Sequence, residues 1–149
     1  MTEVSFYHLQ AEPLERALPR LLEKVSERGM RALVRFKTED LQDLLNTALW
    51  TYSAGSFLPH GTAQEGPADQ QPIFLALEGE ENLNRSDVLV LLENSEAADL
   101  NDFERCLYMF DSNDDAALDA ARNRWKQFKS EGVNVTYWQQ TETGWQKKA

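Results

Sequence analysis

The chain has 149 residues, 42% of them hydrophobic, which favours one globular domain with its own core. No apolar run approaches the roughly 20 residues needed to span a bilayer, so a membrane protein is not expected. Asp and Glu outnumber Lys and Arg by 25 to 15, giving a net charge of −10, and this acidity disfavours direct binding to nucleic acid.

The first predicted elements are a strand and a helix. Residues 3–9 form a short apolar run that polar residues end, as expected for a strand. From Pro13 to Gly29 apolar residues recur at spacings of three and four, which predicts a helix with one core-facing stripe. Pro19 lies inside this pattern, so we expect a kink there or a late helix start.

The middle of the chain continues the alternation. ALVRF at 32–36 predicts a second strand, and Thr38 begins a helix that ends at Trp50. Residues 51–72 form a long connection. Three further strands are expected at residues 73–77, 87–92 and 105–110.

The acidic residues at 111–115 supply caps for a last helix that runs to Ser130, and 133–138 form a final strand. We predict an α/β fold in which helices cover both faces of the sheet, as one domain over 1–140. The polar tail at 141–149 is expected to be frayed.

The expected chemistry is limited. No glycine-rich dinucleotide motif, phosphate loop or nucleophile elbow is present, so we predict no cofactor. Two histidines and one cysteine are too few for a convincing metal cluster, and we predict none. Cys106, in RCLYMF, is expected to be a buried structural thiol. The opening MTEVSFYHLQAEP lacks the pattern of a secretory signal, so the predicted compartment is the cytoplasm.

The segment ALWTYSAGSFLPHGTAQEGP, residues 48–67, combines aromatic residues with Gly, Ser and Pro. Long ordered loops are often functional, and large aromatics are common anchors of protein interfaces. An alternative is that the aromatics pack the loop onto the sheet. A second alternative is a small α/β hydrolase or transferase in which His60 is the base and Glu65 orients it.

The sequence RNRWKQFK, residues 122–129, reverses the sign of the charge locally. On a helix, one face would present Arg122, Trp125, Lys126 and Lys129. Ala121, Arg124 and Phe128 would lie more to the other side. The alternative interpretation is a C-terminal helix whose cations complement its dipole and whose tryptophan packs in the core.

Several of these segments together resemble the chi subunit of bacterial DNA polymerase III. The most specific is ALW followed by SFLPH, and the others occur in the family's order: VSFYHL, ALVRF, PIFLAL, DVLVLLEN, AARNRWKQFK and GVNVTYW. The resemblance covers nearly the whole chain. It implies a three-layer α/β/α domain with a mixed, mostly parallel sheet, like nucleotide-binding folds but without the phosphate loop.

The resemblance also implies a non-catalytic adaptor in the clamp-loader assembly, which binds the acidic C-terminal tail of single-stranded DNA-binding protein. The implied tail-binding residues are Arg122, Trp125, Lys126 and Lys129, with Leu118 at a position that is usually basic. A psi-like subunit or a related helicase is the second implied partner, and the residues implied for it are Trp50, Phe57, Leu58 and Pro59.

Overall fold

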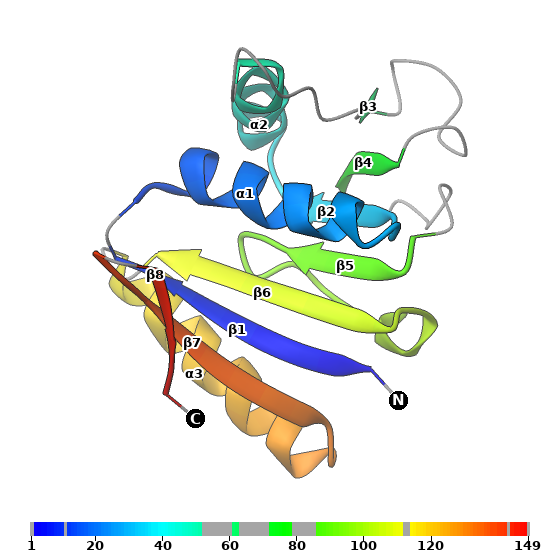
Figure 1. Cartoon of the computed structure of the whole chain (residues 1–149). Coiled ribbons are helices and arrows are strands. Elements are labelled where there is room, and N and C mark those ends of the chain that lie inside the picture. Colours follow the sequence, from blue (N-terminus) through cyan, green and yellow to red (C-terminus); the bar gives the residue numbers. More distant parts are fainter. Residues whose placement is uncertain are drawn as a thin grey trace.

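A computed structural model describes residues 2–10, 12–51, 61–62, 72–78, 86–111, 114–142 and 144–148. In this described part the chain forms eight strands: β1 (Glu3–Leu9), β2 (Ala32–Phe36), β3 (Gly61–Thr62), β4 (Ile73–Leu77), β5 (Val88–Leu91), β6 (Arg105–Asp111), β7 (Asn134–Thr141) and β8 (Gly144–Lys147). The same part contains three α-helices, α1 (Leu14–Glu27), α2 (Glu39–Thr51) and α3 (Asp115–Ser130), and the 3-10 helix η2 (Leu100–Asp102) (Figure 1).

All eight strands belong to one sheet, in the order β3-β4-β2-β5-β6-β1-β7-β8. Neighbouring strands are parallel except for the antiparallel pair β7 and β8. Every residue of β2 and β5 is buried, as expected for central strands of a parallel sheet that is covered on both faces. The sheet is therefore mixed but mostly parallel.

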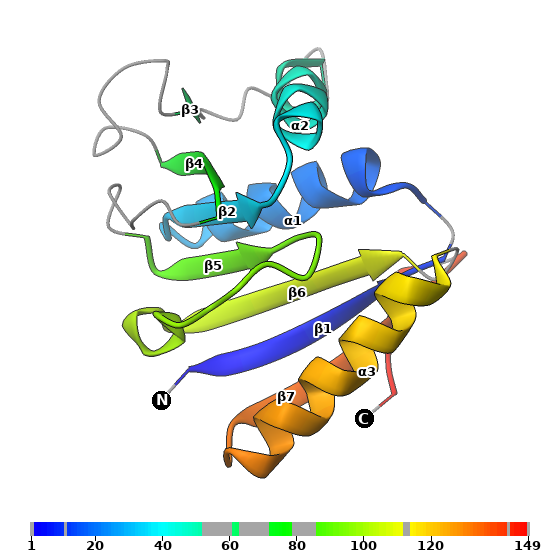
Figure 2. The same cartoon turned by 180° about the vertical axis from the view of Figure 1, so that it is seen from behind.

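Two apolar clusters separate the sheet from its helices. One joins α1 and α2 to one face and includes Leu18, Leu22 and Leu45. The other includes Phe6 and Phe128 and joins α3 and η2 to the opposite face. Figure 2 shows α3 on that side of the sheet. The three-layer α/β/α fold that the sequence predicts is thus confirmed. Cys106 is fully buried in the second cluster, and burial raises the pKa of its thiol to about 12.

The helix boundaries follow local signals. The Asp114 carboxylate caps α3 by accepting from the backbone N–H groups of Ala116, at 3.0 Å, and Ala117, at 3.2 Å. Gly29 and Gly132 follow α1 and α3 with φ of 73° and 76°, which favour glycine.

Of the two alternatives expected at Pro19, a kink or a late helix start, the late start is wrong, because α1 already begins at Leu14. Pro19 lies inside the helix, where it removes one backbone hydrogen bond. Its ring is buried among the core-facing residues of α1, and this burial offsets part of that loss.

The C-terminal tail also differs from its prediction. The segment that was expected to fray instead continues β7 to Thr141 and turns back as β8. Backbone pairing with β7 and the contact of the Trp145 ring with Tyr7, centroid to centroid 5.0 Å, hold this hairpin in place. The long connection after α2 contains the short strand β3, which pairs with β4. No helix among the described residues has the length and apolar character to cross a membrane.

Candidate functional site

A groove of about 410 Å³ runs between α3 and the sheet, and we call it the α3 groove. The helix side of the groove is formed by five residues of α3: Leu118, Ala121, Arg122, Trp125 and Lys126. The sheet contributes His8 of β1, Phe110 of β6 and Tyr137 of β7. These three strands are adjacent in the sheet, so parallel pairing brings residues far apart in the sequence into one floor.

The floor of the α3 groove is aromatic. The ring of His8 stacks on Phe110, with centroids 4.8 Å apart and planes 21° apart. Tyr137 meets His8 edge to face at 5.8 Å and Trp125 edge to face at 5.9 Å. Trp125 also contacts the core residue Phe6 at 5.4 Å. Trp125 is therefore both packed against the core and part of the groove, so the two interpretations of this residue are compatible.

The rim of the α3 groove is cationic. The Arg122 side chain is 67% exposed, and its nearest described carboxylate is that of Asp119 at 3.9 Å, too long for a strong hydrogen bond. Lys126 is also exposed. Lys129 does not line the groove, but its ammonium lies 5.4 Å from the centroid of the Trp125 ring. The structure thus brings Arg122, Trp125 and Lys126 together and places Lys129 beside them.

The opposite side of α3 faces the protein interior, as the helical spacing predicts. Ala121, Arg124 and Phe128 are buried. The Arg124 guanidinium donates to the backbone oxygen of Ser95 at 2.8 Å and lies 5.7 Å from the Tyr108 ring centroid. One of the four cations in RNRWKQFK therefore anchors a loop and is not available to a ligand.

His8 is a site residue that sequence reasoning missed. Its side chain is buried, its Nδ1 hydrogen-bonds the Tyr137 hydroxyl, and its Nε2 has no partner among the described residues. Burial lowers the pKa of His8; the Asp111 carboxylate acts to raise it, and Arg122 acts to lower it further. Alternation along β1 could have indicated this position, because Val4, Phe6 and His8 share one face of the strand.

The lining of the α3 groove suits the binding of a ligand. Its eight lining residues include no carboxylate, hydroxymethyl or thiol group, and the hydroxyl that contacts His8 is the Tyr137 phenol. Among the described residues no group of three or more His, Cys, Asp or Glu side chains is placed to hold a metal ion. A cationic rim above an apolar aromatic floor suits an anionic ligand with an apolar end.

The other predicted site residues lie largely outside the described part of the chain. Trp50 falls in the last turn of α2, but its side chain is not among those described. Phe57, Leu58 and Pro59 lie outside the described residues, as do His60 and Glu65. Neither the second interface nor the alternative catalytic pair is therefore tested by the structure.

The family model and the individual relatives that match this chain all carry the same name, the chi subunit of DNA polymerase III. The family described as DNA polymerase III chi subunit, HolC, matches residues 1–136. The DNA polymerase III subunit chi of Escherichia coli is 32% identical over 107 residues, which cover 72% of each chain. The corresponding Pseudomonas aeruginosa subunit is 29% identical over 89% of this chain and 92% of its own. A probable chi subunit from Rickettsia prowazekii is 30% identical over 74% of this chain and 66% of its own length.

Proposed function

Because the chain belongs to the family of DNA polymerase III chi subunits, we propose that it is a non-catalytic adaptor of the replication machinery. Its α3 groove binds the acidic C-terminal tail of single-stranded DNA-binding protein. The adaptor acts in the cytoplasm, where it links that protein to the clamp loader.

The observation that carries this proposal is the position of Arg122 and Lys126 above the aromatic floor formed by His8, Phe110 and Tyr137. An acidic tail that ends in an apolar residue presents side-chain carboxylates, a terminal carboxylate and one apolar group. The two cations offer charge-assisted hydrogen bonds to the carboxylates, and the floor offers an apolar surface to the last side chain. The Trp125 ring extends this apolar surface along the helix.

The second proposed surface is formed by Trp50, Phe57, Leu58 and Pro59, and it binds a psi-like clamp-loader subunit or a related helicase. Its support is the resemblance of the ALW and SFLPH segments to the family, together with the preference of protein interfaces for large aromatic anchors. The proposal assigns the two partners to different elements, α3 for the tail and the end of α2 with its following segment for the other protein.

The direct test is calorimetric titration with a synthetic peptide that reproduces an acidic tail with a free carboxylate and an apolar last residue. Arg122→Glu and Lys126→Glu should each weaken binding roughly tenfold to a hundredfold, because each removes a charge-assisted hydrogen bond worth about 1.5–3 kcal/mol. Lys37→Glu is the matched control, since Lys37 is exposed and lines neither the α3 groove nor another described hollow. Peptide binding that is indifferent to both reversals would leave the proposal without its mechanism.

A further inference from the structure

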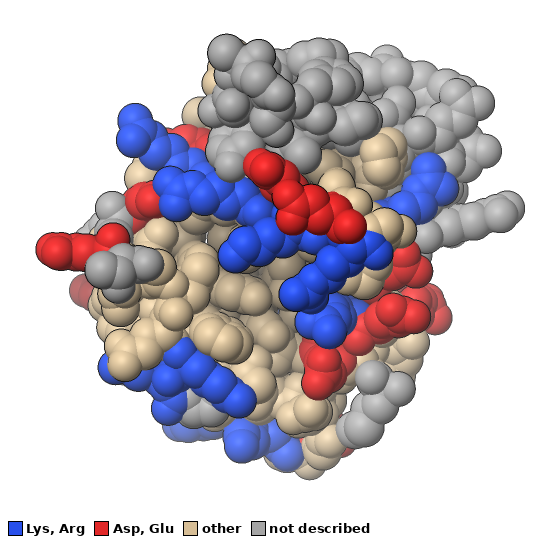
Figure 3. Space-filling view, in the orientation of Figure 1, with Lys and Arg blue, Asp and Glu red and all other residues tan. Residues whose placement is uncertain are grey.

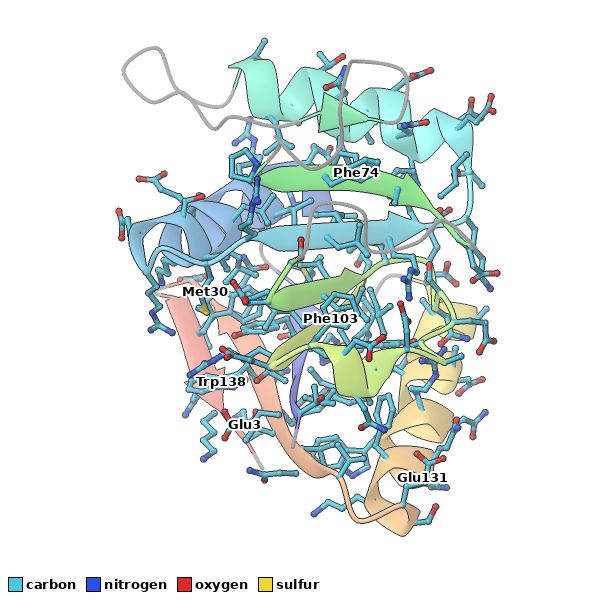
Figure 4. The ribbon with its side chains drawn as sticks, turned by 90° about the vertical axis from the view of Figure 1, so that its right-hand side faces the viewer. Glu3, Met30, Phe74, Phe103, Glu131 and Trp138 are labelled. Atoms are coloured by element: carbon cyan, nitrogen blue, oxygen red, sulfur yellow. The ribbon has the colours of Figure 1, made fainter. Side chains whose placement is uncertain are left out.

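A second hollow of about 400 Å³ lies on the opposite face of the sheet from α3, and we call it the α1 groove. In Figure 1, α1 lies over the middle of the sheet, and among the described elements no helix covers β1 and β7 on this face. The groove extends from the C-terminal end of α1 to the hairpin of β7 and β8. Figure 4 shows Met30 and Trp138 on this side of the sheet, away from α3.

The floor of the α1 groove combines aromatic and hydrogen-bonding groups. Tyr7, Trp138 and Trp145 are partly exposed, and Tyr7 and Trp145 meet edge to face. The same floor contains a hydrogen bond between the hydroxyls of Thr136 and Ser5, at 3.1 Å. Aromatic rings at this density normally pack a core, whereas here they share an open surface with polar side chains. A ligand with both flat apolar faces and polar edges matches this floor.

The rim of the α1 groove is positively charged although the chain carries a net charge of −10. It holds Lys24, Arg28 and Arg105, and Glu3 is the one acidic residue in the lining. None of the three cations forms an ion pair with a described residue. Figure 3 shows basic side chains bordering an uncharged hollow on this face.

Interaction with the dipole of α1 accounts for only two of these three cations. Lys24 and Arg28 lie at the C-terminal end of α1, where cations complement the helix dipole. Arg105 begins β6, and no helix terminus explains its position. Burial raises the pKa of the Tyr7 hydroxyl, and the charges of Arg105 and Arg28 act against that rise, so both guanidinium groups act on the floor of the groove.

We propose that the α1 groove binds single-stranded nucleic acid. Unpaired cations along a groove track phosphates, and aromatic side chains between them stack on bases without reading their sequence. The hydroxyl oxygens of Ser5 and Thr136 retain lone pairs that can accept hydrogen bonds from the N–H groups of base edges. An acidic peptide would match the cations, but only its aromatic residues carry flat rings, whereas every nucleotide of a single strand carries both a phosphate and a base for a floor with three aromatic side chains. Duplex DNA hides its base faces and fits the floor less well.

Binding at the α1 groove is weak and sensitive to salt, because three cations act against the repulsion of an acidic chain. The net charge disfavours nucleic acid over the molecule as a whole, and the groove is a local exception. Nucleic-acid binding at the α1 groove goes beyond the proposed function, although a role for this binding in replication rests on that function. If the α3 groove holds the tail of single-stranded DNA-binding protein, the α1 groove on the opposite face of the sheet would lie close to the DNA that this protein coats. The high effective concentration of that DNA would compensate for weak affinity.

The test is titration of the full chain with short oligothymidylate at low salt, followed by tryptophan fluorescence and by polarisation of a labelled oligonucleotide. We expect quenching of tryptophan emission and a preference for single strands over the matching duplex. Arg28→Ala with Arg105→Ala should lower the affinity roughly tenfold and reduce the salt dependence by about 0.7 in log–log slope for each phosphate that is no longer neutralised. Trp138→Ala should lower the affinity roughly tenfold. Oligouridylate in parallel tells whether RNA or DNA is the better ligand.

Lys37→Ala is the matched control and should leave oligonucleotide binding unchanged. The arginine variants change exposed side chains and should fold like wild type, and circular dichroism of these variants and of Trp138→Ala checks this. Three results would overturn the proposal: absence of binding at low salt, binding that survives the arginine double variant, and equal affinity for duplex. The acidic tail peptide is also added as a competitor to wild type and to Arg122→Glu. If it displaces the oligonucleotide equally from both proteins, the α1 groove binds a peptide and the proposal is wrong. Tail-peptide binding itself should not change in the groove variants, so failure here leaves the proposed function standing.

Discussion

The Tyr137 hydroxyl and the Nδ1 atom of His8 form a hydrogen bond that joins β7 to β1 beneath the α3 groove. This bond fixes the orientation of an imidazole ring that also stacks on Phe110. The charged groups near the ring are Asp111 on β6 and Arg122 on α3, with Lys126 on the same groove rim. The α3 groove therefore contains a titratable group whose pKa a nearby charge can shift.

We expect the affinity for the acidic tail peptide to rise as the pH falls through the histidine range. Burial lowers the pKa of His8, so the ring is neutral in the empty groove near neutral pH. An anionic ligand favours the imidazolium form and raises this pKa, so binding takes up a proton. Each unit by which the peptide raises the pKa gives at most about tenfold higher affinity at low pH. Calorimetry above and below the ordinary histidine pKa measures the effect.

His8→Leu is the variant that isolates this contribution. It keeps an apolar side chain in the floor and removes the titration, so its affinity should vary little over the same pH range. The same pH dependence in wild type and His8→Leu would assign the proton uptake to another group and contradict the prediction.

Leu118 gives a prediction of increased affinity. It lines the α3 groove one turn before Arg122, at a position that the family resemblance implies is usually basic. Leu118→Lys should add a third cation to the rim and strengthen tail-peptide binding by up to about fivefold, the range of a partly exposed ion pair. Leu118→Met is the uncharged control and should bind like wild type. A weaker complex with Leu118→Lys would show that the apolar wall matters more than the charge.

Much of the fold could be predicted because it depends on local periodicity. The stripe of α1 and the apolar run of β5 each follow from spacing within a few residues. The face of α3 was predictable for the same reason, and Arg122, Trp125 and Lys126 do meet at one groove. The sheet-borne half of that groove was not predictable, since its aromatic floor assembles only through strand order.

Long-range polar contacts could not be predicted either, because their partners are far apart in the sequence and meet only in the folded protein. Arg35 lies inside the buried strand β2, and its partner Asp99 is 64 residues away. The polar tail carried too little apolar periodicity to predict β8, whose stability depends on pairing with β7 and on one tryptophan. The α1 groove could not be predicted, because Arg105 lies far from Lys24 and Arg28 in the sequence and the net charge of −10 gives no indication of a local positive patch.

Loss of the Asp99 carboxylate should destabilise the protein. The Arg35 guanidinium is buried and donates to both carboxylate oxygens of Asp99, at 2.8 and 2.9 Å, and to the Glu96 backbone oxygen at 3.0 Å. Asp99→Asn leaves a buried cation without its counter-charge and should lower the free energy of unfolding by about 2–3 kcal/mol. Urea denaturation measures this, and Asp119→Asn, at an exposed pair 3.9 Å apart, is the control with little effect.

The same ion pair predicts how stability depends on pH. The hydrogen bond from Arg35 lowers the pKa of Asp99, and the charge of Arg35 adds to this against the opposing effect of burial. The folded-state pKa therefore lies below the unfolded value, so the stabilisation is present above the unfolded pKa and is lost as the pH falls through the folded one. The loss of stability on acidification should be smaller in Asp99→Asn. Equal acid sensitivity of the two proteins would contradict this assignment.

Removal of the Trp145 ring should show that the C-terminal hairpin is folded. The ring meets Tyr7 edge to face at 5.0 Å, a geometry worth about 0.5–1.5 kcal/mol beyond the area buried. Trp145→Ala should therefore lower the melting temperature measurably, whereas Trp145→Phe should retain most of the stability. An unchanged melting temperature in Trp145→Ala would support a frayed tail.

The final prediction separates the two proposed protein-binding surfaces. Trp50→Ala and Phe57→Ala should weaken binding to a psi-like subunit or helicase, because truncation of a large aromatic anchor removes about 2 kcal/mol or more at an interface hot spot. Both variants should bind the tail peptide like wild type, since the cations proposed to hold the peptide lie on α3. Arg122→Glu should show the reverse pattern. Pull-down with the partner and calorimetry with the peptide, on variants whose circular dichroism matches wild type, measure both activities. Equal loss of both activities in a folded variant would mean that one surface serves both partners.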